Sequence, residues 1–225
     1  MTTVPFDIVG FDLDGTLLDT AQDLGVALNH ALGLAGRGAV PLGAVRDLIG
    51  GGARQMLVKG LEVTGGPLPD AEVSALHREL VAFYAENIAV HSRLFPGGAA
   101  MLDALAAQGV KLAVVTNKLE SLAVKLLGEL GLSERFYTII GGDTLGPGRA
   151  KPRPDLIHLM LERAGLERPR AAYVGDTSFD SGAAAAAGLP CVIVSFGFND
   201  RPPAELGAAA VIDHYDALVP ALVSL

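Results

Sequence analysis

Tryptophan does not occur in this chain of 225 residues, and cysteine occurs once, at Cys191. A single cysteine excludes a disulfide within the chain, which fits a reducing compartment. Cys191 opens the apolar run 191–194, so we expect it to be a buried small residue.

Positive charge is also scarce. The chain has 17 lysine and arginine residues against 25 aspartate and glutamate residues, which gives a formal net charge of −8. A nucleic-acid partner requires a basic face and is not expected. No apolar run reaches the roughly 18 to 20 residues of a membrane span, and the first residues lack the basic and apolar regions of a signal peptide. We therefore expect a soluble, cytoplasmic protein with no membrane partner.

Short apolar runs alternate with longer helical patterns along most of the chain. Several of these runs are apolar on both faces, as the strands of a parallel sheet are. The repetition of strand, helix, strand predicts an α/β fold with a doubly wound, mainly parallel sheet, a Rossmann-like core. Strands are expected at 8–11, 112–116, 137–141, 172–175, 191–195 and 211–212, with helices at 99–108, 120–130, 155–164 and 180–187.

Two carboxylates follow the first expected strand, in the run Asp12-Leu13-Asp14-Gly15-Thr16. Side chains two residues apart on a strand point to the same side, so Asp12 and Asp14 face one pocket if the chain begins to turn. Carboxylates in one pocket repel each other, and a hard cation such as Mg²⁺ between them offsets the repulsion. Gly15 lets the backbone approach a ligand and turn its amide toward an anion. The alternative is an ordinary strand end with an Asp-Gly turn.

A mainly helical stretch comes directly after this motif and interrupts the alternation. It predicts a helical cap at residues 20–91 and an α/β core formed by residues 1–19 and 92–225. Periodicity alone does not distinguish a cap from helices that cover one face of the sheet, but the position directly after the motif favours the cap. Its helical patterns lie at 21–34, 42–49, 53–61 and 70–86.

Polar residues also follow two later strands, where ligands of an open α/β sheet bind. Thr116, Asn117 and Lys118 offer a hydroxyl, an amide and a cation that suit phosphate oxygens, although a polar loop explains them equally well. Asp176 and Asp180 bring two more carboxylates to a third strand end.

Lys151 precedes the Pro152 that leads toward the helix expected at 155–164. Held at the site, this lysine neutralises both phosphate and carboxylate. The alternative is a solvent-exposed lysine, the commonest position of that residue.

The order of these pieces resembles the four motifs of the haloacid-dehalogenase-like hydrolases, and within them of the phosphatases. The pieces are Asp-x-Asp-Gly-Thr, Thr-Asn, Lys-Pro and Gly-Asp-x-x-x-Asp, and they span residues 12–180. The resemblance implies a helical cap that closes over a Mg²⁺-dependent active site.

The resemblance also implies a role for each matching residue. Asp12 is the nucleophile and a Mg²⁺ ligand, and Asp14 is the general acid and base and binds Mg²⁺ through its main-chain carbonyl. Lys151 neutralises charge at the reacting phosphate. The remaining roles are phosphate binding by Thr116, Asn117 and Gly15, metal ligation by Asp176 and support of the metal site by Asp180.

A finer resemblance, to the phosphoglycolate phosphatases, rests on Asp19-Thr20, on residues 47–57 and on residues 195–198. Three glycines at 50–52 precede a helix and leave its first amides free for an anion, with Arg54 in the first turn. The resemblance implies hydrolysis of 2-phosphoglycolate, a small phosphorylated metabolite, by a monomer or homodimer. A flexible loop between two helices explains the three glycines almost as well.

Other enzymes remain open. A phosphatase for sugar phosphates or pyrophosphate, or a phosphosugar mutase of the same superfamily, shares the same core pattern. A receiver domain is disfavoured because it is shorter and carries its acceptor aspartate later in the fold. A haloalkanoate dehalogenase is disfavoured because it needs neither Asp14 nor a metal.

Overall fold

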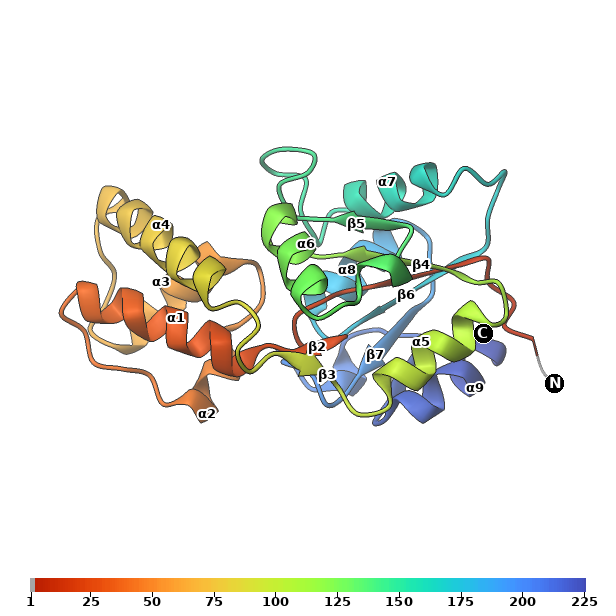
Figure 1. The fold of residues 1–225 in the computed structure, drawn as a ribbon, viewed down its shortest axis with the longest axis horizontal. Coiled ribbons are helices and arrows are strands. Elements are labelled where there is room, and N and C mark those ends of the chain that lie inside the picture. Colours follow the sequence, from red (N-terminus) through yellow and green to blue (C-terminus); the bar gives the residue numbers. More distant parts are fainter. Residues whose placement is uncertain (1–2) are drawn as a thin grey trace.

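A parallel sheet forms the centre of the computed structural model, which describes residues 3–225. Within these residues the strand order is β5-β4-β1-β6-β7-β8, and every neighbouring pair is parallel (Figure 1). The prediction of a doubly wound parallel sheet is therefore confirmed. The strands are β1 (Ile8–Phe11), β4 (Lys111–Val115), β5 (Thr138–Ile140), β6 (Ala171–Gly175), β7 (Cys191–Val194) and β8 (Ala210–Ile212).

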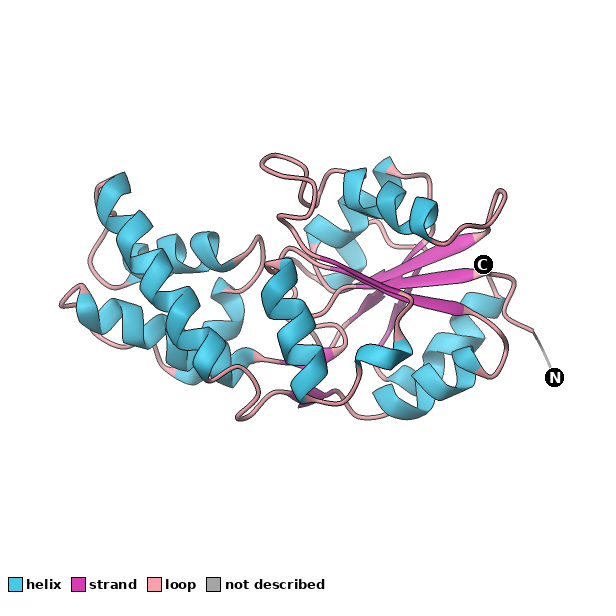
Figure 2. Cartoon of the chain, turned by 45° about the horizontal axis from the view of Figure 1, so that its top comes forward, coloured by secondary structure: helices cyan, strands magenta, loops and turns pink. Residues whose placement is uncertain are grey.

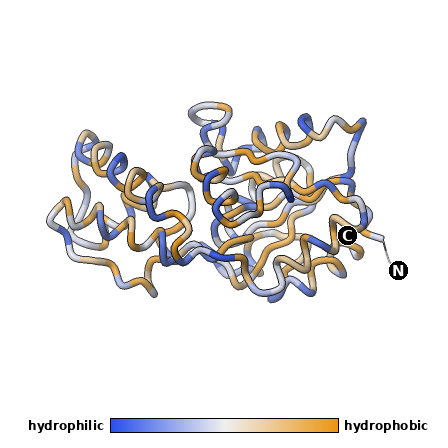
Figure 3. The backbone as a smooth tube through the Cα atoms, in the orientation of Figure 1, coloured by the Kyte–Doolittle hydropathy of each residue, from blue (hydrophilic) through white to orange (hydrophobic). Residues whose placement is uncertain are grey.

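Helices cover both faces of the sheet (Figure 2). In β1, Val9 and Phe11 pack into the core on one face and Ile8 into the core on the other. Because strands such as β1 are buried on both faces, they are apolar runs rather than alternating patterns (Figure 3). One face is covered by α5 (Gly98–Ala106), α6 (Glu120–Glu129) and α9 (Leu218–Val223), the other by α7 (Asp155–Arg163) and α8 (Ser178–Ala186).

The helices of residues 20–91, the helical insert, gather beyond the carboxyl ends of the strands (Figure 1). This arrangement differs from the alternative in which they cover a face of the sheet. The exact limits of the two domains stay a prediction. The insert contains α1 (Ala21–Leu34), α2 (Leu42–Val45), a 3-10 turn (Arg46–Leu48), α3 (Ala53–Val63) and α4 (Asp70–Glu86).

None of the helices in residues 3–225 combines the length and the apolar character that crossing a membrane requires.

The chain enters and leaves the insert through a short antiparallel ribbon that the sequence did not indicate. It consists of β2 (Leu18–Asp19) and β3 (Arg93–Leu94), and strands of two residues are too short to give a periodic signal. The buried Asp23 of α1 holds the returning chain. Its carboxylate accepts hydrogen bonds from the Ser92 N–H at 2.8 Å, the Ser92 hydroxyl at 2.7 Å and the His91 N–H at 3.0 Å.

We predict that Asp23→Ala lowers the free energy of unfolding by about 2–4 kcal/mol, because it leaves two buried donors of Ser92 without an acceptor. Urea denaturation followed by circular dichroism measures the loss. The exposed Asp47 provides the control, and Asp47→Ala should change stability by less than about 0.5 kcal/mol. A loss below about 1 kcal/mol for Asp23→Ala would show that water replaces the carboxylate.

Candidate active site

Three strands place their last residues side by side at one edge of the sheet. β1 pairs with β4 on one side and with β6 on the other. Asp12, Thr116 and Asp176 directly follow these strands, so the expected site residues from three separate parts of the chain meet at the carboxyl edge.

Lys151 is the buried cation of this edge. Its Nζ lies 2.8 Å from Asp12 Oδ1 and 2.7 Å from Asp180 Oδ1, and it donates to Val115 O and to the Tyr173 hydroxyl at 3.1 Å each. Burial by itself lowers the pKa of Lys151, but the charges of Asp12 and Asp180 outweigh it and hold the pKa well above its usual value. Lys151 therefore stays protonated, and the alternative of a solvent-exposed lysine is wrong.

The buried carboxylate of Asp12 has lone pairs that no hydrogen bond uses. Lys151 directs hydrogen bonds to Asp180, Val115 and Tyr173, and among the described residues no well-directed donor is left for Asp12 Oδ1. Burial raises the pKa of Asp12 to about 6, against the opposing charge of Lys151. Lys151 therefore balances this carboxylate by charge rather than by a directed hydrogen bond, which leaves lone pairs of Asp12 for a metal cation.

The carboxylates of Asp12, Asp176 and Asp180 form a buried acidic cluster with one oxygen from each within 4.8 Å of the others. Burial raises the pKa of Asp176 well above its usual value, and the charges of Asp180 and Asp12 raise it further. Three carboxylates outnumber the single lysine, and all the donors are oxygens, which hard divalent cations prefer. The residues present therefore fit a divalent metal ion.

Asp180 also orders the loop after β6. Its second oxygen accepts hydrogen bonds from the Thr177 N–H at 3.0 Å, the Thr177 hydroxyl at 2.7 Å and the Asp176 N–H at 3.2 Å. This carboxylate thus connects Lys151 with the start of α8. Its support of the metal site stays a prediction.

Gly15 packs directly against Asp176. Its φ is +83°, and a Cβ there would lie 2.3 Å from Asp176 Oδ2 and 2.7 Å from the Phe198 ring, so only glycine fits. The Gly15 N–H donates to Leu18 O at 2.9 Å, and the expectation that this amide faces a substrate anion does not hold in this structure. Next to it, the Thr16 hydroxyl donates to Asp176 Oδ1 at 3.0 Å.

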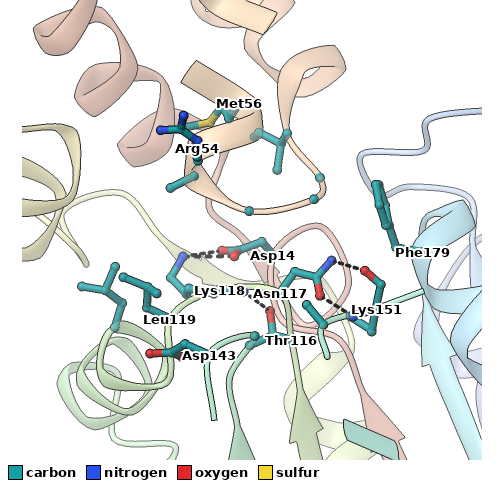
Figure 4. A pocket seen from close by; sticks show the side chains of 18 of the residues that line it. Asp14, Arg54, Met56, Thr116, Asn117, Lys118, Leu119, Asp143, Lys151 and Phe179 are labelled. Carbon is teal, nitrogen blue, oxygen red and sulfur yellow. Dashed lines mark hydrogen bonds and ion pairs between the residues drawn. The ribbon is translucent and has the colours of Figure 1, made fainter. Parts of the chain in front are cut away.

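The carboxylate of Asp14 points toward Lys118 (Figure 4). Lys118 Nζ lies 2.9 and 3.0 Å from its two oxygens, and the Thr20 hydroxyl donates to Oδ1 at 2.8 Å. Burial works to lower the pKa of Lys118, but the charge of Asp14 raises it above its usual value. Ligation of a metal by the Asp14 main-chain carbonyl stays a prediction.

Asn117 holds the backbone of Lys151. Its Oδ1 accepts from the Lys151 N–H at 2.9 Å and its Nδ2 donates to Lys151 O at 3.1 Å (Figure 4). The Nδ2 group has two N–H donors and this contact uses one, so the side chain of Asn117 can still donate to a phosphate oxygen. Thr116 Oγ1 accepts from the Lys118 N–H at 3.2 Å. Phosphate binding by either residue stays a prediction.

The glycine loop Gly50–Gly52 of the insert lies close to this edge of the core. All three glycines have positive φ, at +111°, +71° and +92°. A Cβ on Gly52 would lie 3.3 Å from Asn117 O, and one on Gly50 would lie 3.8 Å from the Phe179 ring. The loop is therefore in contact range of the core and does not stand free in solvent.

Arg54 is on the same side but is engaged within the insert. Its guanidinium donates to the Ser74 hydroxyl at 3.3 Å and pairs with Asp70, both on α4, and 44% of its side chain is exposed. Recognition of a substrate carboxylate by Gly50–Arg54 stays a prediction.

A cavity of about 420 Å³ lies between the insert and the core. The core contributes the polar wall and the insert a largely apolar one, so a small ligand with charged ends fits between them. Lining residues include Asp12, Asp14, Thr116, Lys118, Lys151 and Asp176 from the core, and Ile49, Met56, Leu80, Val81 and Tyr84 from the insert.

Two further residues line the cavity: Lys118, which the sequence offered as a cation for phosphate oxygens but to which the resemblance gave no role, and Tyr84, which the sequence did not indicate. Lys118 is the third residue after β4 ends, in the run Thr116-Asn117-Lys118, and this place near a strand end is the signal by which the sequence indicates it. Tyr84 lies on α4, where helical spacing indicates only which face is buried. Its pKa is raised to about 12, chiefly by burial.

Known proteins resemble this chain over nearly its whole length. A sequence model of the haloacid dehalogenase-like hydrolases matches residues 9–194. The phosphoglycolate phosphatase of Agrobacterium fabrum is 41% identical over 225 residues, which cover 99% of this chain and 95% of that protein. The phosphoglycolate phosphatase of Rhodospirillum rubrum is 38% identical over 212 residues, 92% of this chain and 87% of that protein.

The fold is also found in solved structures. The crystal structure of a predicted phosphoglycolate phosphatase from Haemophilus somnus has a TM-score of 0.86 and 31% identity, and the match covers 96% of this chain and 97% of that one. The sequence match extends across the sheet and the insert. The chain belongs to the haloacid dehalogenase-like hydrolases.

Proposed function

We propose that this protein is a phosphatase that hydrolyses 2-phosphoglycolate to glycolate and phosphate. The observation that carries the reaction is the buried Asp12 carboxylate, which lies beside the protonated Lys151 and within a cluster that fits a divalent cation. The substrate rests on the relatives from A. fabrum and R. rubrum, which are named phosphoglycolate phosphatases.

The reaction proceeds in two displacements. A carboxylate oxygen of Asp12 attacks phosphorus, the bond from phosphorus to the glycolate oxygen breaks, and Asp14 gives its proton to the leaving oxygen. A water molecule then loses a proton to Asp14 and attacks the phosphorus of the aspartyl phosphate. Phosphate leaves, and both aspartates return to their starting states.

Charge neutralisation supplies most of the remaining catalysis, because phosphoryl transfer depends on alignment and on the charge of the phosphoryl oxygens. Lys151 provides one positive charge, and Thr116 binds a phosphoryl oxygen. Asp12, Asp176 and the main-chain carbonyl of Asp14 would hold Mg²⁺, with Asp180 in support, and the bound ion would supply further positive charge.

The proposal assigns catalysis to a core of residues 1–19 and 92–225, and closure over the substrate to residues 20–91. Its partner is the small phosphorylated substrate. The proposed setting is the cytoplasm, with the protein as a monomer or homodimer.

We predict that hydrolysis stops when divalent cations are removed. Three carboxylates converge around Asp12 with one lysine to balance them, so the phosphate dianion meets net negative charge without the metal. Release of phosphate from 2-phosphoglycolate is measured after exhaustive chelation and after Mg²⁺ is restored. Undiminished turnover in the chelated protein would contradict the metal requirement. Ca²⁺ should serve less well than Mg²⁺, because it prefers more ligands at longer distances.

We predict that Asp12→Asn lowers kcat by at least ~10³-fold, since an amide does not attack phosphorus as a carboxylate does. The substitution keeps the size of the side chain, and thermal unfolding checks that the fold is retained. The exposed Asp213, changed to Asn, is the matched control and should leave kcat unchanged. A loss smaller than about tenfold for Asp12→Asn would rule out its role as nucleophile.

A further inference from the structure

Tyr84 carries a buried hydroxyl that makes no well-directed hydrogen bond to the described residues, although the Lys118 ammonium lies close enough to offset part of the effect of burial on the pKa of Tyr84. The residue is on α4 of the insert, 2% of it is exposed, and it lines the cavity that faces Asp12. A buried hydroxyl normally finds a partner, since leaving it unpaired costs free energy. An unpaired hydroxyl at the wall of a ligand cavity indicates that the partner comes with the ligand.

Lys118 lies next to Tyr84 and comes from the core. Its Nζ is 4.5 Å from the centre of the Tyr84 ring, and only 5% of its side chain is exposed. Two of the contacts of this ammonium group go to the oxygens of Asp14, at 2.9 and 3.0 Å. An ammonium group has three N–H donors, so Lys118 can add an acceptor without giving up Asp14.

We propose that Lys118 and Tyr84 together bind the second anionic group of the substrate, the carboxylate of a small phosphorylated acid. This inference rests on the proposed function, and it assigns the phosphoryl end to Asp12 and Lys151 and the carboxylate end to the other wall of the same cavity. Both residues line the cavity, and an ammonium and a hydroxyl at its wall give a carboxylate a charge-assisted hydrogen bond and a second donor.

Lys118 and Tyr84 differ from Arg54 in burial and in hydrogen-bond partners. Both Arg54 and Lys118 line the cavity, but Arg54 is 44% exposed and bonded to Asp70 and Ser74 of its own insert, whereas Lys118 is buried. Tyr84 belongs to the insert and Lys118 to the core, so a carboxylate bound by both also holds the insert against the core.

The test compares two esters that differ at one end. 2-Phosphoglycolate carries the carboxylate, and 2-hydroxyethyl phosphate replaces it with a neutral hydroxyl group. We measure kcat/KM for both esters with Mg²⁺, in the wild type and in Lys118→Met, Tyr84→Phe and Lys125→Met. The quantity compared is kcat/KM for 2-phosphoglycolate divided by kcat/KM for 2-hydroxyethyl phosphate. This ratio is used because loss of the contact between Lys118 and Asp14 affects both esters. Lys125 is on the exposed side of α6, paired with Glu129, and is the control.

The ratio should fall about 30- to 100-fold in Lys118→Met and about 5- to 10-fold in Tyr84→Phe, and stay within about twofold of wild type in Lys125→Met. Tyr84→Phe removes one oxygen and keeps the packing, so it tests the subsite even if Lys118→Met unfolds. An unchanged ratio in both cavity variants, with or without equal losses on the two esters, would overturn the subsite.

A binding experiment keeps the subsite separate from the proposed function. Calorimetry in the Asp12→Asn background measures the affinity for 2-phosphoglycolate with and without Lys118→Met, and it needs no turnover. A wild type that hydrolyses neither ester would contradict the proposed function. Affinity that falls at least about tenfold with Lys118→Met would still support the subsite, and unchanged affinity would overturn it.

Discussion

The ion pairs of the buried Lys151 are the interaction on which the site depends. The carboxyl ends of β1 and β6 bring several carboxylates into one buried site. Negatively charged carboxylates that lie close together there raise one another's pKa. One lysine, held by Asn117 and paired with Asp12 and Asp180, keeps this arrangement from being purely repulsive. The charge that remains unbalanced is what fits the site to a divalent cation.

The insert completes a cavity that the sheet alone leaves open. Its glycine loop rests on the core beside Asn117, and α4 brings Tyr84 to the ammonium group of Lys118. The core lines the cavity with charged groups such as Asp12 and Lys151, and the insert adds a mostly apolar wall that also carries Tyr84, Arg54 and His77. Substrate choice can therefore change through the insert while the residues around Asp12 stay as they are.

Much of the fold follows from patterns within short stretches of sequence. Runs such as 191–194 are apolar because the strand is buried on both faces, and position at a strand end placed Asp12, Thr116 and Asp176 together. The missed features depend on contacts between distant residues. The ribbon of β2 and β3 is too short for a period, and nothing in the sequence near Gly15 shows that its amide is already bonded to Leu18.

The most direct measurement of the central claim is the identification of the phosphorylated residue during turnover. The wild-type protein is mixed with 2-phosphoglycolate and Mg²⁺, quenched in acid within milliseconds, digested and analysed by mass spectrometry. The account predicts one added phosphoryl group on the peptide that contains Asp12, located at that residue by fragmentation. A phosphoryl group on any other residue would contradict it, as would rapid hydrolysis in which quenched samples never contain a phosphorylated protein.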